Sequence, residues 1–378
     1  MNILMDHKHN KYINNKLANK KWLPNKTLNK KPYDFLITIP CYDEYDYIFK
    51  TLDSINCQDI NILKNTLVSV AINNSMNENK SIIANNQRTY QKLLNNKYNF
   101  ELIVIDAFSK NKSLESKISG VGMARKICVD LMISNLKSNS IICFIDADTI
   151  LSEKYLSKIK SSYNKNNWSA ATVNFLHQED EPKTKKLIRE YEKILKVTSS
   201  NIKECGSPYS YVSLGSTMIC TCSAYISVGG MNKRAAGEDF YFLQELEKFC
   251  GVQQINDILV HPSSRYLSRL YMGTSMRLQK SLNRELNLST LYFSESSFKI
   301  LRKWIKLALL SDKRDYNALV RDIKKIDLEL LSFLHKINFK KAWNSIVSAP
   351  SYNHFSKQFH RWFDALSVFK LLKFYTRP

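Results

Sequence analysis

The stretch SIICFIDADT, residues 140–149, decides the fold class. Its apolar run, Ile141 to Ile145, is typical of a buried strand, and it ends abruptly in two carboxylates, Asp146 and Asp148. Alternate residues of a strand point the same way, so both side chains would project just past its carboxyl end. In open α/β sheets ligands bind at that edge. Two like charges there indicate a divalent cation, Mn²⁺ or Mg²⁺, although one Asp could simply cap the following helix.

Similar apolar, β-branched runs precede and follow this stretch and alternate with helix-like segments. The predicted strands are residues 35–40, 66–75, 100–107, 140–149 and 170–177, and the predicted helices are 44–56, 79–95, 120–137, 153–165 and 183–204. Apolar runs that are continuous, not alternating, belong to strands that are covered on both faces. The pattern therefore predicts an α/β domain with a mostly parallel central sheet and helices on both faces.

Positive charge is concentrated at the two ends of the 378-residue chain. The formal net charge is +22, of which residues 1–32 carry +7 and residues 299–378 carry +11. Beyond residue 281 the pattern becomes helical. We therefore expect a basic, loosely packed extension over 1–32, a catalytic domain over 33–280 and a basic helical region over 281–378. Such ends suit an anionic membrane or polymer, or they merely solvate the surface.

The cysteines and the apolar runs indicate a reducing, cytoplasmic setting. The eight cysteines form no C-x-x-C pair, and most lie within apolar runs where cysteine acts as a small hydrophobe. No apolar leader and no uninterrupted apolar run of about 18 residues is evident. Peripheral contact with the inner face of an anionic membrane stays open, and no nucleic-acid partner is expected.

A second acidic pair, Glu238 and Asp239, opens the segment GEDFYFLQEL. Its helical periodicity places both carboxylates in a first turn, where acidic side chains are favoured by the helix dipole alone. The functional alternative is a general base, held by a rigid helix, that takes a proton from an attacking hydroxyl.

Basic side chains near these acids could bind phosphate. Arg125 follows Gly120 and Gly122 at a helix start, which is a suitable place for an anion. Arg265 and Arg269 are four residues apart and would share a face if helical. His261, after a strand-like run, could complete the coordination of a metal ion, although a histidine there is more often structural.

Taken in order, these segments resemble the family 2 glycosyltransferases of the GT-A fold. The resemblance covers roughly residues 35–278 and runs through IPCYDEYDYI, NNS, GVGMARK, FIDADT, GSTMICTCSAYISVGGMNKRAAGEDFYF and HPSSRYLSRLYMGTS. It implies an enzyme that moves a sugar from a nucleoside-diphosphate donor to a hydroxyl acceptor, which would be a glycan, a lipid-linked or a small molecule.

The resemblance also assigns roles to individual residues. It implies that Asp239 is the base of an inverting displacement, beside Glu238, and that Asp148 binds the metal. The donor would be bound by residues from several segments: Pro40, Tyr42, Glu44, Asn74, Arg125, Asp146, Arg265 and Arg269.

The chain departs from the family pattern at three places. Asn73, Asn74 and Ser75 replace the acidic residue that usually reads the base, and Asp43 stands where the family usually has Asn. QFHRW, residues 358–362, matches the Q-x-x-R-W signature of processive synthases but lies far along the chain from the Glu-Asp pair. We interpret it as the apolar side of a last helix.

Two other functions are compatible with the sequence. The chain could be a catalytically silent GT-A-like module that holds an anionic polymer or a membrane surface, which the basic ends would favour. Nucleotidyl transfer also uses metal-bound carboxylates on a similar sheet, but its Gly-rich signature after the first strand is missing, since IPCYDEYD follows instead.

Overall fold

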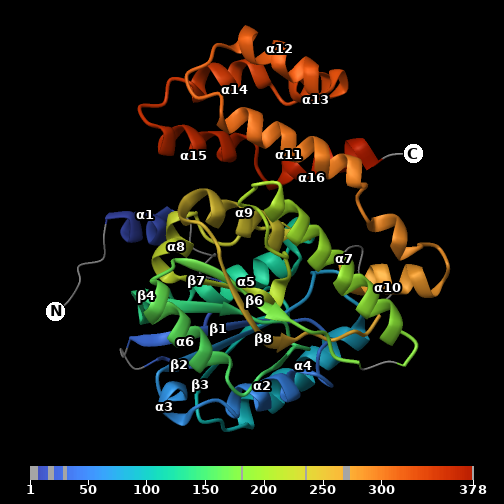
Figure 1. The fold of residues 1–378 in the computed structure, drawn as a ribbon. Coiled ribbons are helices and arrows are strands. Elements are labelled where there is room, and N and C mark those ends of the chain that lie inside the picture. The colour runs from blue at the N-terminus through green and yellow to red at the C-terminus, as the bar shows by residue number, and fades with distance from the viewer. Residues whose placement is uncertain are drawn as a thin grey trace. The chain divides into compact units, whose positions relative to one another are not determined.

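The computed structural model describes residues 7–15, 21–28, 32–179, 182–234, 236–266 and 273–376. The chain forms two compact units, one of Met1–Lys185 with Ser213–Gln279 and one of Lys186–Val212 with Lys280–Pro378. The first unit holds the sheet, and the second is helical (Figure 1). Residues 186–212 therefore belong with the helical region, whereas we expected them in the catalytic domain.

Within the described residues, eight strands form one sheet in the order β3-β2-β1-β4-β7-β6-β8-β5. β1 pairs in parallel with β2 and β4, β2 with β3, and β6 with β8, while β7 runs antiparallel to its neighbours. The strands are β1 Tyr33–Cys41, β2 Thr66–Asn73, β3 Glu101–Ala107, β4 Leu136–Phe144, β5 Ile150–Leu151, β6 Ala170–Phe175, β7 Met218–Thr221 and β8 Gln253–His261.

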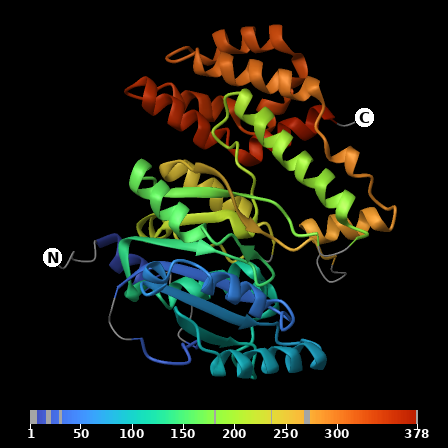
Figure 2. The ribbon, with the colours of Figure 1, turned by 60° about the horizontal axis from the view of Figure 1, so that its bottom comes forward.

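The order of the first four strands places helices on both faces of the sheet. From β1 to β3 the chain moves in one direction, and from β3 to β4 it crosses back past β1. Because parallel crossovers are right-handed, α2 (Ile48–Asn56) and α4 (Lys80–Asn95) lie on one face and α5 (Val121–Asp130) on the other. Figure 2 shows α4, the blue-green helix at its bottom, running along the sheet. This confirms the predicted α/β class.

The reversal of direction creates a switch point between β1 and β4. The two strands are in register from Phe35 with Ile141 to Thr38 with Phe144, so their carboxyl ends open at the same edge. In doubly wound sheets this is where ligands bind. The segment after β1 and the D-x-D segment after β4 therefore meet there, as the sequence predicts.

Several predicted boundaries were wrong. The helix predicted over 120–137 is α5 and ends at Asp130, because the chain turns through a short 3₁₀ segment before β4 begins at Leu136. The strand predicted over 140–149 ends at Phe144, and the two aspartates lie in the loop beyond it. Arg265 itself lies outside any helix, so the condition under which it would share a helix face with Arg269 is not met at Arg265.

The parts of the N-terminal extension that the structure describes are packed against the first unit, which corrects our expectation of loose packing. Tyr12, on α1 (His7–Asn15), and Trp22 are buried, with 3% and 2% of their surface exposed. The segment around Trp22 covers the free edge of β3: Pro24 bridges Ile105, and the Trp22 indole donates to the carbonyl of Lys112 (2.7 Å). Covering an edge strand in this way blocks its unpaired backbone groups.

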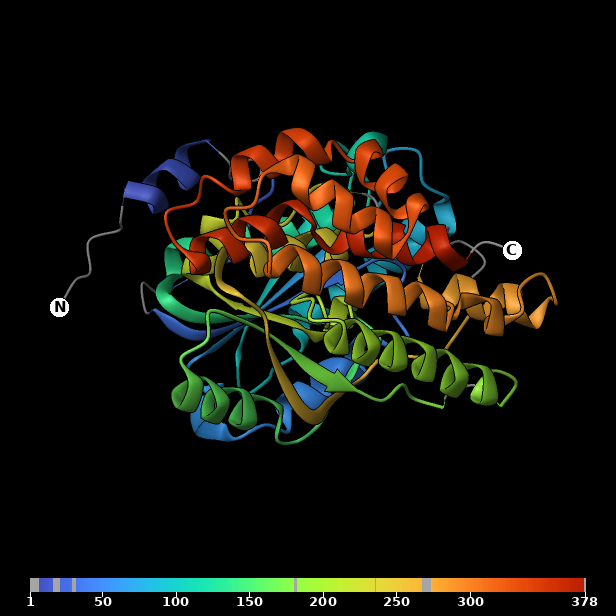
Figure 3. The ribbon, with the colours of Figure 1, turned by 45° about the horizontal axis from the view of Figure 1, so that its top comes forward.

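The remaining helices of the first unit surround the sheet, and the second unit is built from helices packed on an aromatic core. In the first unit these are α3 Ile60–Leu63, α6 Tyr155–Asn166, α8 Cys222–Ser227, α9 Glu238–Cys250 and α10 Thr274–Leu282. In the second they are α7 Lys185–Glu204, α11 Glu295–Leu309, α12 Tyr316–Ile326, α13 Leu328–Lys336, α14 Phe339–Ile346, α15 Tyr352–Trp362 and α16 Ala365–Thr376. Figure 3 shows α11 and α16, in orange and red, side by side.

The QFHRW segment lies on α15 of the helical unit. Trp362 and Phe363 pack into its core, next to Trp304 and Phe339, and the Trp362 indole donates to the carbonyl of Ile337 (3.2 Å). The packing agrees with the interpretation of these residues as an apolar helix side. Among the described residues, no helix has both the length and the apolar composition needed to cross a bilayer.

Candidate active site

The D-x-D loop follows β4 directly at the switch point. The side chains of Asp146 and Asp148 are 36% and 21% exposed, whereas Ala147 between them is buried. The alternation predicted for a strand therefore survives in the loop, and both carboxylates reach solvent. They lie close enough for the charge of Asp146 to act on Asp148, whose pKa is raised mainly by burial.

Side chains from three other segments hold the backbone of residues 146–148. The hydroxyl of Ser216 accepts from the backbone amide of Asp146 (3.0 Å), and Thr51 donates to the carbonyl of Ala147 (2.8 Å). Gln178 donates to the carbonyl of Asp148 (2.9 Å) and to the carbonyl of His261 (2.6 Å). The loop backbone is thus fixed by side-chain hydrogen bonds, which is what a site that positions a reactant requires.

Arg125 joins the two acidic motifs. Its Nη2 atom pairs with Oδ1 of Asp146 (2.5 Å), and its Nη1 atom pairs with Glu238. The guanidinium is 1% exposed, so it cannot meet a ligand directly in this arrangement. A planar guanidinium can hold two carboxylates in a fixed geometry. Arg125 was predicted to bind the donor; the structure shows it as the fork between the D-x-D loop and helix α9.

Two glycines leave the room that this fork needs. A Cβ atom on Gly215 would lie 2.0 Å from Nη2 of Arg125, and one on Gly122 would lie 2.7 Å from the carbonyl oxygens of Asn232 and Arg234. Any larger residue at either place would push apart the fork or the loop that leads to α9. Gly122, at the start of α5, therefore serves close packing.

Asp239 lies in the first turn of α9 and is half-exposed. Its Oδ1 atom accepts from the amide of Phe240 (2.7 Å), and no ion pair to it is seen among the described residues. Burial raises its pKa above the ordinary range, against the opposing attraction of Arg125. Burial likewise raises the pKa of Glu238 to about 7, against the same opposing attraction. Of the pair, Asp239 is the carboxylate that a substrate can reach.

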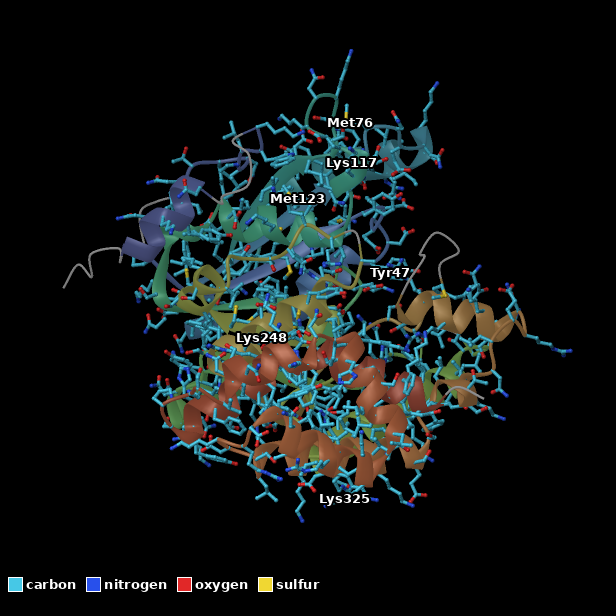
Figure 4. All side chains as sticks on the ribbon, turned by 90° about the horizontal axis from the view of Figure 1, so that it is seen from above. Tyr47, Met76, Lys117, Met123, Lys248 and Lys325 are labelled. Atoms are coloured by element: carbon cyan, nitrogen blue, oxygen red, sulfur yellow. The ribbon has the colours of Figure 1, made fainter. Side chains whose placement is uncertain are left out.

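Arg265 forms a second fork beside the first. It pairs with Oδ2 of Asp148 (2.8 Å) and with Glu44 (2.5 Å), and its guanidinium lies 4.0 Å from the ring centre of Tyr47. Figure 4 labels Tyr47, in the segment that follows β1. Glu44 and Arg265, both predicted to bind the donor, thus lie in direct contact. Arg269 lies outside the described residues.

The residues predicted to contact the nucleotide lie at the ends of β1 and β2. Pro40 is in β1 opposite Ala71, and Tyr42 follows the strand, half-buried. Asn74 is 1% exposed; its amide donates to the carbonyls of Ser75 (2.8 Å) and Phe108 (3.2 Å). Asn74 is therefore used in holding the edge of the sheet.

Asp43 explains one departure from the family pattern. Its φ is +59°, the left-handed region that Asp and Asn tolerate better than other residues with a side chain. Its amide donates to Oδ1 of Asn86 (2.9 Å), which fixes the turn after β1. Asp at this position keeps the backbone conformation that Asn would provide.

The acidic groups suit a hard divalent cation. No three His, Cys, Asp or Glu side chains among the described residues form a ligand cluster, and Nδ1 of His261 lies 2.9 Å from the carbonyl of Leu176. Mg²⁺, however, is usually held by one or two carboxylates with water and substrate phosphates. The partly exposed Asp146 and Asp148 fit that mode of binding, with His261 left as a predicted further ligand.

Sequence reasoning missed the residues that support the site. Ser216 and Gly215 lie inside the GSTM segment that the family resemblance includes, so that segment was a usable signal. Thr51 and Gln178 carried no signal, because their roles depend on contacts with the D-x-D loop, which lies 96 residues from Thr51 and 30 residues from Gln178 in the sequence.

Comparison with known proteins gives distant structural matches. No protein-family model and no curated protein matches the chain. A crystal structure of S. aureus TarS 1–349 in complex with UDP-GlcNAc covers 86% of this chain and 91% of that chain, with 13% identity and a TM-score of 0.45. The mannosyltransferase PcManGT from Pyrobaculum calidifontis, in complex with GDP-Man and Mn²⁺, covers 94% and 86%, with 13% identity and a TM-score of 0.41. At such values neither structure indicates what this chain binds.

Proposed function

We propose that this chain is a metal-dependent, inverting glycosyltransferase of the family 2 type, acting in cell-surface glycan or glycoconjugate synthesis. It would transfer a sugar from a nucleoside-diphosphate donor to a hydroxyl acceptor. The observation that carries the proposal is the Arg125 fork, which brings a D-x-D carboxylate and a Glu-Asp pair together at the switch point of the sheet. This is the combination that donor binding and base catalysis need in one place.

In the donor half of the site, Asp146 and Asp148 would hold Mn²⁺ or Mg²⁺, with His261 as a predicted further ligand. When bound there, the cation supplies positive charge for the diphosphate leaving group. Arg265 would add to it, because its guanidinium already lies at Asp148 and can pair with a phosphate oxygen. Pro40, Tyr42, Glu44 and Asn74 would form the nucleotide side, and Arg269 stays a predicted donor contact.

In the acceptor half, Asp239 would take the proton of the acceptor hydroxyl. The acceptor oxygen then bonds to the anomeric carbon on the face opposite the diphosphate. The bond from that carbon to the diphosphate oxygen breaks, its electron pair leaves with the diphosphate, and the configuration inverts. The raised pKa of Asp239 makes its carboxylate a better proton acceptor than an ordinary aspartate. Glu238, paired with Arg125, would hold the helix turn in place.

The test is an assay of UDP- and GDP-sugars for transfer or donor hydrolysis, with Mn²⁺ or with EDTA. We expect activity that EDTA abolishes and that Asp239→Asn lowers by about 10²–10⁴-fold, the usual contribution of a general base. Glu245→Gln removes an acid from the exposed side of the same helix and is the matched control. Activity that survives both EDTA and Asp239→Asn would exclude this mechanism. Donor binding without turnover would support the silent binding module instead.

A second role, contact with an anionic membrane surface, is favoured by the helical unit. On α11 the side chains of Lys299, Lys303 and Lys306 lie on one face, and the next position on it is Leu310, which is 73% exposed. Lys325 on α12 also points outward (Figure 4). A basic face with a protruding leucine suits a bilayer that carries anionic lipid.

Vesicle binding tests this second role. We expect the chain to sediment with phosphatidylglycerol vesicles and not with phosphatidylcholine, and less so as salt rises. Each basic residue contributes about 1 kcal/mol near such a surface, so Lys303→Gln with Lys306→Gln should weaken binding roughly tenfold or more. Lys160→Gln with Lys165→Gln, two exposed lysines of α6, is the matched control. Equal effects of the two pairs would refute a docking face on α11.

A further inference from the structure

The hydroxyl of Tyr12, in the N-terminal helix α1, belongs to a cluster of buried polar side chains that are hydrogen-bonded to one another. It donates to Oδ1 of Asp130 (2.8 Å) and accepts from Nζ of Lys126 (2.7 Å). Tyr225 donates to the same carboxylate oxygen (3.1 Å). At most 4% of the surface of Tyr12, Lys126 and Asp130 is exposed, and Tyr225 is fully buried. A segment that precedes the sheet by about twenty residues is thus part of the interior of the first unit.

Lys126 and Asp130 form an ion pair one turn apart on α5 (2.8 Å). Removing two charges from water is costly, and their attraction compensates only when further hydrogen bonds satisfy the remaining polar groups. Tyr12 provides such bonds to both partners at once. The pair therefore depends on α1 for part of its stabilisation, and in return it fixes where α1 binds.

The same helix carries the fork of the proposed active site. Arg125 is the residue directly before Lys126, and all of α5 from Gly122 to Asp130 is buried. A rotation or shift of this short helix moves the Arg125 guanidinium by a similar amount. Since its contacts with Asp146 and Glu238 are at hydrogen-bond distance, a movement of about 1 Å would break both.

Tyr12 also contacts the chain that leads to the base. A Cβ atom on Gly230 would lie 2.0 Å from the Tyr12 hydroxyl, and Gly230 has a φ of +75° that favours glycine. The segment after Gly230 runs to the start of α9, where Glu238 and Asp239 lie. Tyr12 therefore adjoins both the helix that carries the fork and the turn before the base.

We propose that Tyr12 is a positioning residue of the active site, and that the N-terminal helix sets the orientation of Arg125 through Lys126 and Asp130. The inference rests on the proposed function for its kinetic consequence, but its structural part stands on the contacts alone. It assigns the extension a role in the reaction that its composition does not suggest, since its lysines indicate only a basic tail.

Tyr12→Phe in the full chain is the sharpest test, because it removes the hydroxyl and keeps the ring that packs edge-on against Tyr225. The matched control is Trp22→Phe. It removes another buried hydrogen bond of the same extension, but at the edge of β3 and not at α5. Trp22→Phe also removes part of a buried ring, so it should cost at least as much stability as Tyr12→Phe, and stability alone does not distinguish the two roles.

Two measurements decide the outcome. Hydrogen exchange should be faster over residues 121–130 and 236–242 in Tyr12→Phe, and faster only near residues 102–114 in Trp22→Phe. The turnover number for sugar transfer, measured well below the melting temperature, should fall by about tenfold in Tyr12→Phe and less than about twofold in Trp22→Phe.

The two proposals can fail separately. If the wild type transfers no sugar, the proposed function fails, while the exchange experiment still tests the positioning role. If Tyr12→Phe lowers the melting temperature but leaves both the exchange of α5 and the turnover number as in Trp22→Phe, Tyr12 is only a packing residue and the inference is overturned.

Discussion

Two arginines in this molecule make similar contacts from different surroundings. Arg125 pairs with Asp146 and Glu238, and Arg265 pairs with Asp148 and Glu44. Each therefore ties one carboxylate of the D-x-D motif to an acid elsewhere in the chain.

The surroundings differ in what holds each side chain. Arg125 is on a fully buried helix and 1% exposed. Arg265 is 9% exposed, lies outside any helix and stacks over Tyr47 beside the partly exposed Asp148. Breaking a buried pair leaves a charge without water. Arg265 is also largely buried, but its partner Asp148 is 21% exposed, so a phosphate can take the place of that carboxylate. We infer that Arg125 holds the site together and that Arg265 is the arginine that meets the donor.

Arg125→Lys should have the largest effect. Lysine keeps the charge but lacks the planar fork, so it cannot pair with both carboxylates. We expect the free energy of unfolding to fall by about 3 kcal/mol and the transfer rate by about 100-fold. Urea unfolding and the transfer assay measure the two. Arg88→Lys, at an exposed arginine over Tyr45, is the control; equal losses in both variants would contradict the distinction.

Arg265→Lys should affect binding more than stability. A lysine cannot make the paired contacts of a guanidinium with phosphate, so the affinity for UDP or GDP in the presence of Mn²⁺ should weaken about tenfold. The Arg265–Glu44 pair is largely buried, so the free energy of unfolding should also fall, but by less than in Arg125→Lys because Arg265 lies outside any helix and next to the partly exposed Asp148. Calorimetric titration gives the affinity. Unchanged nucleotide binding would show that Arg265 is a structural arginine like Arg125.

Ser216→Ala tests the other support of Asp146. The serine hydroxyl accepts from the Asp146 amide (3.0 Å) and donates to Oδ2 of its carboxylate (2.9 Å). Its loss should cost about 1–2 kcal/mol of stability and lower the transfer rate roughly fivefold, since Arg125 still holds the other oxygen. Ser157→Ala on exposed α6 is the control. A loss as large as that of Arg125→Lys would mean that the loop, not the fork, is the main support.

The pH dependence of stability should also report on the buried fork. Burial raises the pKa of Glu238 to about 7, from 4.5. The folded state therefore binds the proton more tightly, and this group's contribution to stability is complete below pH 4.5 and is lost as the pH rises to about 7. The slope is at most about 1.4 kcal/mol per pH unit. Glu238→Gln should flatten it, and an unchanged slope would mean that other groups cause it.

Local sequence pattern was enough to propose some residues of the candidate site. Asp146 and Asp148 were recognisable because an apolar run ends in them, and Asp239 because a helix begins there. The role of Arg125 was not predictable, because a glycine-flanked helix start looks the same whether its arginine faces solvent or two buried acids. Ser216 and Tyr12 depend on contacts 70 and 118 residues apart. The end of α5 at Asp130 was also missed, since apolar spacing continues into the following turn.

A double-mutant cycle between Asp146→Asn and Glu238→Gln, measured by urea unfolding, tests most directly whether Arg125 joins the two halves of the site. The two acids share one guanidinium, so their effects on the free energy of unfolding should differ from the sum of the single changes by about 0.5–3 kcal/mol. In an Arg125→Met background that coupling should fall below about 0.5 kcal/mol. Additive effects with Arg125 in place, or coupling that persists without it, would contradict the fork.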